Sequence, residues 1–556
     1  MTLRMKIFST YLVAICVAAL CSMGSVWATS HADADVQIAD SDNKSHRPRL
    51  VINIVVSSMR ANDLDRYAAN FSDGGFERLR NGGAHFTNAH LGYLNTSTPA
   101  GLATITTGAQ PSEHGVVGTH WWNFVDGTRV ELINDNKSYS VDFSTGSGNY
   151  SPHRLVAPTL GDMLIADDSR NKQITIAIDP VSAITMNGKS GVAYWAETNQ
   201  THWTTSSAYT DKLPKWVKEY NQSDTNSYYT LSRWTTLYNA TSYRNDEVAV
   251  VEGISGKSTR LLSDINLNLA KDIYGKMRYT PAGNTMLLKF AASAIAQEKL
   301  GQDDAPDILN ICLDTPRYVA ETYGPESMEY EDMLYRLDKD LEEFLLYAYA
   351  QVGDASDIVV VLCSDHGTSP SYNPVGGDER ERFNTRQMEV IVNAFLGAKH
   401  GSDNYILGFA NNAIYLNHTL IRDKGLSIDA IRDEVAVFVL QLRGVATARS
   451  TTALRNTSFE EGRGRMMQRS FYATRSGDIV LDPLPGWIIE NGDYRSTSLS
   501  GYNYDSHIPL IIYGGGIEAQ TIERETDIAQ LAATISHLIG IGTPWAASGH
   551  RIVEIE

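Results

Sequence analysis

The sequence predicts a doubly wound α/β fold with a mostly parallel sheet and two insertions. Five short apolar runs without polar alternation are typical of strands covered on both faces. They are Leu50–Val56, Ile174–Ile178, Ile308–Leu313, Ile358–Leu362 and Ile508–Tyr513. Helical patterns lie between these runs, and the clearest is a stripe of Leu334, Leu337, Leu341, Phe344 and Leu345. Two stretches, 196–280 and 396–495, interrupt the alternation of strand and helix and predict the insertions.

The first 28 residues have the pattern of an export signal. Arg4 and Lys6 precede the apolar run Ile7–Cys21, and Ala28 ends an allowed cleavage site. The run is too short for a convincing membrane span, so we expect none after cleavage. Residues 29–47 are polar, without periodicity, and predict a disordered leader before a main domain over 48–556. The expected location is periplasmic or secreted.

Composition excludes several kinds of partner. The chain has 556 residues, 42% of them hydrophobic, so it can bury a large core. Its 47 basic and 65 acidic side chains give a net charge of −18, which repels nucleic acids and anionic lipid surfaces. Two cysteines, Cys312 and Cys363, remain beyond the signal, each in a strand-like run. Two inert core thiols are favoured over a disulfide, which stays an alternative.

The two insertions have different patterns. The stretch 196–280 is rich in aromatic residues, including Trp203, Trp216 and Trp234, and predicts a packed cap beside a pocket. An ordinary aromatic core is favoured there over a surface that stacks on a ligand. The stretch 396–495 predicts a small α/β subdomain, with strands near Asn412–Leu416 and Asp478–Leu481 and a helix over Ile428–Leu442.

Three groups of polar residues fall where an open α/β sheet collects its functional side chains, at the carboxyl ends of strands. Asp365 and His366 follow a strand and are suitable metal ligands. Thr98 is expected to cap a helix that runs from Pro99 to Gly108, where a phosphate would be stabilised. His507 precedes the last core strand. Each also has an ordinary interpretation, as a helix cap, a loop anchor or a structural histidine.

Five segments of the chain, taken in order, resemble motifs of the alkaline phosphatase superfamily. They are RPRLVINIVVSSMR, NTSTPAGLATITTG, EHGVVGTHWW, CSDHG and YDSHIPLIIYG. The chain is most similar to the PafA-type periplasmic enzymes with a threonine nucleophile, and less so to the type I phosphodiesterases and nucleotide pyrophosphatases. The resemblance implies two zinc ions, each held by three side chains, beside the nucleophile. It places the nucleophile at Thr98 and surviving zinc ligands at Asp365, His366 and His507.

The departures from the family pattern are equally specific. Ser57, Arg317 and Glu321 stand where the resemblance implies zinc ligands, and Thr119, Asp179 and Val181 stand where it implies groups that bind the phosphoryl oxygens. The remaining carboxylates would leave two zinc ions poorly neutralised. We therefore expect no zinc or one divalent metal. Arg317 is expected to pair with Asp365 or to bind an anion, and Thr98 is expected to have no adjacent base.

Two functions remain open. The first is a degenerate exported protein with little phosphomonoesterase activity, whose cleft and aromatic insertion bind an anionic small molecule or a protein. The second is a metal-dependent phosphate-ester hydrolase with a rearranged or single-metal site. Such a site could use Asp365 and His366 with Asp314 or Asp179, or Glu321 beside His507. A sulfatase is a weaker alternative, because those enzymes need Cys or Ser at the position of Thr98.

Overall fold

The structure of the protein is a computed structural model that describes residues 47–555, apart from 143–147, 198–201, 224–233, 246–272, 373–381 and 490–493. The predicted export signal and nearly all of the predicted leader lie outside the described residues. In the described part of the chain, no helix has both the length and the apolar character needed to cross a membrane.

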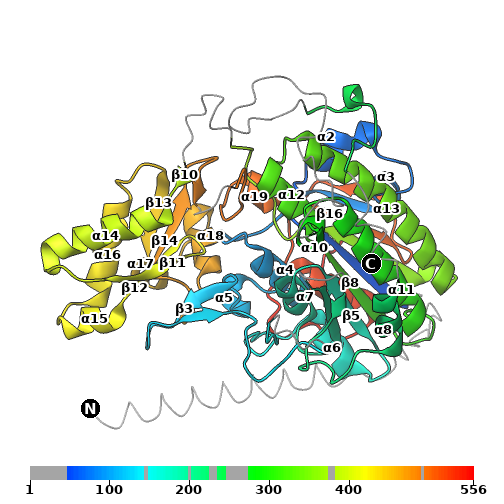
Figure 1. Ribbon diagram of the computed structural model, residues 1–556, viewed down its shortest axis with the longest axis horizontal. Helices are drawn as coiled ribbons and strands as arrows, with labels where there is room; N and C mark the ends of the chain where they lie inside the picture. Colours follow the sequence, from blue (N-terminus) through cyan, green and yellow to red (C-terminus); the bar gives the residue numbers. More distant parts are fainter. Residues whose placement is uncertain are drawn as a thin grey trace, which may run out of the picture. The chain divides into compact units, whose positions relative to one another are not determined.

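The main sheet has the order β17-β2-β16-β9-β1-β8-β5-β6-β7. Figure 1 labels its strands β16, β8 and β5. Its central strands are β9 (Ile358–Cys363), β1 (Leu50–Val56), β8 (Asp307–Leu313), β5 (Gln173–Ala177) and β6 (Val192–Ala196), all parallel. β16 (His507–Gly514) is antiparallel to β9 and to β2 (Ala84–His90), and β7 (Trp203–Thr204) is antiparallel to β6. β17 (Gln520–Ile522) and β18 (Thr526–Asp527) pair with β2. The five predicted strands and the mostly parallel sheet are confirmed.

Both faces of this sheet are covered. In β1, Leu50, Ile52 and Ile54 belong to one buried apolar cluster, whereas Val51 and Val55 belong to another. The first cluster includes α11 (Ala282–Glu298) and α13 (Met328–Val352), and the second includes α4 (Thr98–Thr107), α7 (Pro180–Asn187) and α20 (Gln530–Ile539). All five residues of the predicted helical stripe are buried in α13. Continuous apolar strands are thus explained by helices on both faces.

Shorter elements connect the layers. They are α2 (Asp63–Tyr67), α3 (Phe76–Gly82), α5 (Pro111–His114), β3 (His120–Trp122), β4 (Arg129–Glu131), α6 (Leu160–Asp167), α8 (Lys215–Gln222), α10 (Ile273–Met277), α12 (Thr315–Tyr323), β10 (Arg382–Phe383), β15 (Ile488–Ile489) and α19 (Asn503–Ser506).

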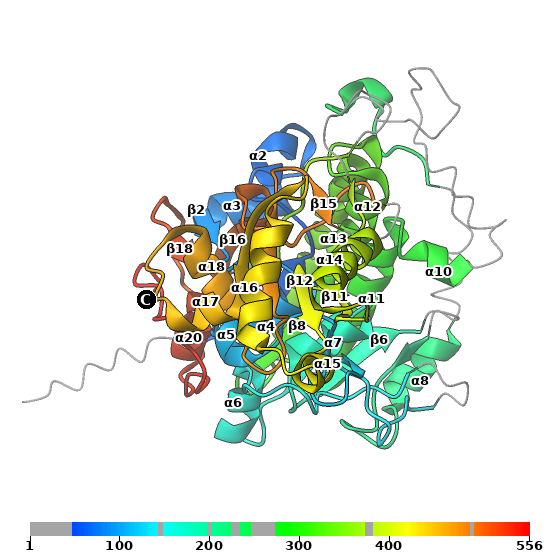
Figure 2. The ribbon, with the colours of Figure 1, turned by 90° about the vertical axis from the view of Figure 1, so that its left-hand side faces the viewer.

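A smaller lobe is built on a second, antiparallel sheet, β11-β12-β14-β13. Its strands are β11 (Ile406–Ala410), β12 (Ala413–Leu416), β14 (Ile479–Pro483) and β13 (Val445–Ser450). Its helices are α14 (Thr385–His400), α15 (His418–Asp423), α16 (Ile428–Val439), α17 (Thr451–Asn456) and α18 (Gly462–Ser470), and Figure 2 shows α14 and α16 in front. The predicted strands and helix of the 396–495 insertion are present, although α14 already begins before it.

The tryptophans of the 196–280 stretch form part of the core. Trp203 is fully buried and stacks on Phe290, with ring centroids 4.2 Å apart. Trp216 packs on the same ring, and the indole N–H of Trp234 donates to Asp332 at 2.7 Å. None of these tryptophans lines the pocket described below. Among the described residues, these three tryptophans pack as the ordinary-core interpretation expects, while the cap beside a pocket stays a prediction.

Cys312 and Cys363 are free and buried. Both lie opposite Val55, one on each side of β1, so a central strand separates them. Burial raises the pKa of both thiols. The prediction of two inert core thiols is confirmed.

A buried histidine beside α4 predicts a specific response to acid. The Val116 N–H donates to His114 Nδ1 at 3.0 Å, so Nε2 carries the proton toward Thr104 Oγ1. Burial lowers the pKa of His114 from 6.5 to about 3. The imidazole of His114 is therefore protonated in the unfolded chain at a pH at which it is still neutral in the folded protein. The free energy of unfolding consequently decreases as the pH falls from 6.5 toward 3.

For His114→Asn, which keeps an acceptor but does not titrate, we expect a smaller loss of stability between about pH 7 and about pH 4.5 than in the parent. The measurement is the urea midpoint of both proteins across this range. Equal slopes would show that His114 is not held neutral.

Candidate functional site

Helix α4 brings Thr98 to the carboxyl end of the main sheet. The structure corrects the expected cap: Ser97 is the N-cap, and Thr98 is the first helical residue, followed by Pro99. Gly108 ends the helix with φ of 68°, as predicted. Gly101 lets the helix approach the next loop closely, because a Cβ at this position would lie 2.0 Å from the carbonyl oxygen of Asp365. The helix thereby fixes Thr98 beside the residues that follow β9.

Thr98 contacts an imidazole. Its Oγ1 lies 3.0 Å from Nε2 of His366, and Nδ1 of the same ring lies 2.6 Å from the carbonyl oxygen of Gly367. A carbonyl only accepts, so Nδ1 carries the proton, and Nε2 of the neutral ring accepts the hydroxyl of Thr98. The expectation that Thr98 lacks an adjacent base is thus wrong. The sequence hides this neighbour because 268 residues separate the two side chains.

Asp365 is fully buried and satisfied by the protein itself. Its Oδ2 accepts from the hydroxyl of Ser57 at 2.8 Å. Its Oδ1 accepts from the backbone N–H groups of Ser58, at 3.1 Å, and of His366, at 2.9 Å. Ser58 adopts φ of 67°, a strained conformation for a non-glycine residue, which orients its N–H toward the carboxylate. Ser57, at a position where the family resemblance implies a zinc ligand, is therefore a hydrogen-bond donor to a surviving carboxylate.

Arg317 does not pair with Asp365, contrary to one expectation. Its guanidinium lies 3.5 Å from Asp179, 3.7 Å from Asp314 and 3.6 Å from Glu321, and it stacks on the ring of Tyr318. All three acids are thus within ion-pair distance of one cation. Burial raises the pKa of Asp314 to about 6 although the arginine opposes the shift. These three acids neutralise the positive charge of Arg317 within the protein.

The proposed third ligands for a single metal are also engaged. Asp314 accepts from Ser182 Oγ at 2.6 Å and from two backbone N–H groups. Asp179 caps α7 through the N–H of Val181, at 2.8 Å, and accepts from the hydroxyl of Tyr318. Each carboxylate therefore has a structural role in the chain as it stands.

The structure does not bring His507 to the other candidate residues. Its Nε2 donates to the carbonyl of Thr87 at 2.9 Å, and its ring stacks on His90 with centroids 4.6 Å apart. Neither His507 nor His90 lines the pocket, whereas Glu321 does. A site built from Glu321 and His507 together is not present.

A pocket of about 530 Å³ opens in front of Thr98, at the size of a small-molecule site. Of the predicted site residues, it is lined by Thr98, Thr119, Asp179, Val181, Arg317, Glu321 and His366. Sequence reasoning missed its other wall, which comes from β3, β4, the smaller lobe and the loop before α19. This wall includes His120, Trp122, Arg129, Arg386, Glu389, Phe409, Asn411, Asn412, Ser498 and Leu499. Three of these, Asn411, Asn412 and Leu499, have positive φ. The two asparagines form the turn of the β11–β12 hairpin, in which Ala410 pairs with Ala413, and an Asn pair between two strands is typical of such a turn.

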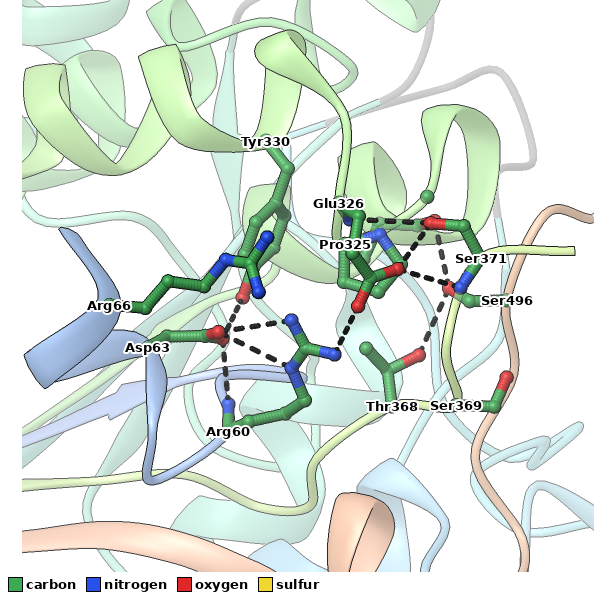
Figure 3. Close-up of polar contacts among 12 residues, drawn as sticks. Arg60, Asp63, Arg66, Pro325, Glu326, Tyr330, Thr368, Ser369, Ser371 and Ser496 are labelled. Carbon is green, nitrogen blue, oxygen red and sulfur yellow. Dashed lines mark hydrogen bonds and ion pairs between the residues drawn. The ribbon is translucent and has the colours of Figure 1, made fainter. Parts of the chain in front are cut away.

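A buried ion-pair network supports the loop that carries His366 (Figure 3). Arg60 is 6% exposed and donates to Asp63, through Nε at 3.3 Å and Nη2 at 3.1 Å, and to Glu326 through Nη1 at 2.6 Å. Glu326 accepts in turn from the backbone N–H of Ser371 at 2.7 Å and from its hydroxyl. The loops after β1, α12 and β9 are thus held together by one arginine and one glutamate.

The candidate metal ligands are bonded to other parts of the protein. Among the described residues, no group of three or more His, Cys, Asp and Glu side chains is placed to hold a metal ion. Asp365 and His366 lie together, and every polar atom of both side chains already has a partner in the protein.

Comparison with known proteins defines the class. The chain matches the family model of type I phosphodiesterases and nucleotide pyrophosphatases over residues 51–505, and it belongs to this family. It is 31% identical to alkaline phosphatase PafA of Elizabethkingia meningoseptica over 526 residues, which cover 93% of this chain and 96% of the relative. It is 29% identical to alkaline phosphatase PhoV of Synechococcus elongatus, over 92% and 93% of the two chains.

Solved structures agree with these relatives. The crystal structure of wild-type PafA has a TM-score of 0.84 at 30% identity, and the match covers 92% of this chain and 99% of the other. Murine ectonucleotide pyrophosphatase/phosphodiesterase 5 has a TM-score of 0.51 at 11% identity and shares the fold alone. The resemblance to PafA-type alkaline phosphatases is confirmed for fold and family.

Proposed function

We propose that the protein is an exported member of this family that has lost the two-zinc site, has little or no phosphomonoesterase activity, and binds a ligand in the pocket in front of Thr98. The observation that supports this most directly is the hydrogen bond from Ser57 to Asp365. Two carboxylates at these positions would need a cation between them. A serine satisfies the remaining carboxylate without one.

A second candidate is a phosphate-ester hydrolase with a single metal at Asp365 and His366. The contact of Thr98 with His366 favours it, since a hydroxyl that donates to an imidazole can be activated as a nucleophile. Against it stands the complete set of protein partners around both candidate ligands.

Zinc content separates the two candidates. We expect protein purified from zinc-supplemented medium to carry well under one zinc per chain by elemental analysis, and zinc to leave its melting temperature unchanged. Hydrolysis of p-nitrophenyl phosphate should stay near background with or without zinc, while PafA prepared identically serves as the active control. Two tightly held zinc ions would overturn the proposal. One zinc, with hydrolysis that Thr98→Ala abolishes, would establish the second candidate.

Export rests on residues 1–28, which lie outside the described part of the chain. The supporting result would be an exported protein whose amino terminus, determined by Edman sequencing, follows Ala28.

A further inference from the structure

A second pocket lies in a groove between α11 and α13, the helices that cover the face of the main sheet opposite to α4. Its volume is about 440 Å³, the size of a small-molecule site, and Tyr220 of α8 also lines it. None of its lining residues belongs to the pocket in front of Thr98. Figure 1 shows α11 and α13 together on the right of the view. The groove is therefore a separate feature, and the proposed function gives it no role.

The floor of this groove is apolar. On α13, Asp340, Phe344 and Tyr347 recur at helical spacing and so share one face, as do Leu288 and Ala292 on α11. Leu288 and Phe344 are each 3% exposed, whereas Tyr347 is 39% exposed. The first two therefore form the bottom of the groove, and Tyr347 lies at its mouth.

Asp340 lies in this apolar groove without a basic partner. Its Oδ2 accepts from the hydroxyl of Thr285, on α11, at 2.6 Å. In the part of the chain that the structure describes, no lysine, arginine or histidine lies within ion-pair distance of its carboxylate. Burial raises the pKa of Asp340 to about 6, and the neighbouring Glu343 adds to the shift. A carboxylate in such a place is stabilised when a cation is brought to it.

The basic side chains nearby pair with other acids. Lys289 pairs with Glu343 at the rim of the groove, and Arg336 pairs with Asp332 at 2.8 Å. The charges of these pairs cancel, so the lining keeps the negative charge of Asp340. The chain as a whole has a net charge of −18, which adds to the attraction of a cation.

The aromatic rings of the lining favour an organic cation. Phe344 and Tyr347 lie on the same face of α13 as Asp340, and Tyr220 contributes a third ring from α8. The ring of Tyr220 is fixed by an edge contact with Phe290, with centroids 5.1 Å apart. Aromatic faces stabilise an ammonium group, and the apolar part of the same molecule packs on them. Divalent metal ions are less suited to the groove, because they prefer several oxygen ligands to apolar walls.

From this arrangement we infer that the groove between α11 and α13 binds an organic ammonium ion, whose N–H groups donate to Asp340 while its apolar part packs on Phe344 and Tyr347. The inference goes beyond the proposed function and does not depend on it, since the two pockets share no residue.

The test is isothermal titration calorimetry on the full-length protein at neutral pH. Its three probes, phenethylamine, phenethyl alcohol and phenylpropanoate, have the same ring but a cationic, a neutral and an anionic end group. We expect phenethylamine to bind at least about tenfold more tightly than phenethyl alcohol, because its hydrogen bond to Asp340 is charged on both sides. Phenylpropanoate should not bind.

Asp340→Asn keeps the shape of the side chain and an acceptor for Thr285 while it removes the charge. Its affinity for phenethylamine should fall by about tenfold, to that for phenethyl alcohol. Asp304→Asn is the matched control, because it removes the same charge at a side chain that is 93% exposed and outside the groove. It should bind phenethylamine like the parent.

If Asp340→Asn fails to fold, Ala292→Phe replaces it, since a larger side chain on α11 fills the groove and should abolish phenethylamine binding. Equal affinities of the parent for phenethylamine and phenethyl alcohol would overturn the inference, as would a failure of phenethylamine to bind. Binding of phenethylamine that neither Asp340→Asn nor Ala292→Phe weakens would show that it binds elsewhere, and would also overturn the inference.

Discussion

Arg60→Met should lower the free energy of unfolding by about 3–5 kcal/mol, the range for removing one partner of a buried ion pair. The substitution removes the cation between Asp63, which is fully buried, and Glu326. It keeps the length and apolar stem of the side chain, so lost packing contributes little. The measurement is urea unfolding at neutral pH, with the slope of the transition checked for two-state behaviour.

Two further variants separate charge from shape. Glu326→Gln keeps an acceptor for Arg60 and for Ser371 and should cost clearly less than Arg60→Met. The double variant Arg60→Met with Glu326→Met should be less unstable than the sum of the single variants, because it no longer leaves the Glu326 carboxylate, whose side chain is 26% exposed, without its cation. Full additivity would show that Arg60 and Glu326 do not act together, and that the loops in Figure 3 are held by other contacts.

The fold could be predicted because its signals are local. Each central strand is a continuous apolar run, and α13 shows a stripe at helical spacing, so burial on both faces can be inferred from a few neighbouring residues. Strand β2, which lies between β16 and the short strands β17 and β18, was not predicted. Its sequence, AHFTNAH, is partly exposed and mixes polar with apolar residues, so it resembles a loop until it pairs with β16.

The site could be predicted only in part, because its contacts join distant segments. Motif order brought Thr98, Asp365 and His366 to one sheet edge, and the structure places them together. The order of the motifs could not show that Ser57 donates to Asp365, nor that Nε2 of His507 donates to the carbonyl of Thr87. Those outcomes depend on loop conformations, such as the positive φ of Ser58, which sequence patterns do not indicate.

Arg317→Met should cost about 3 kcal/mol at neutral pH, the lower part of the range for a broken buried pair, since the guanidinium is 16% exposed and lies at ion-pair rather than hydrogen-bond distance from its acids. The variant leaves Asp179, Asp314 and Glu321 together without a cation. The pKa of Asp314, which is already raised to about 6, should rise further.

The pH dependence of Arg317→Met identifies the cause of its instability. An acid whose folded pKa is raised destabilises the protein as the pH rises through that value, so the deficit relative to the parent should be small at about pH 5 and should grow toward about pH 8. Arg170→Met is the matched control, because Arg170 is 59% exposed and pairs with surface acids, and it should match the parent at every pH. A deficit independent of pH would mean that Arg317 stabilises by packing on Tyr318 rather than by neutralising the three acids.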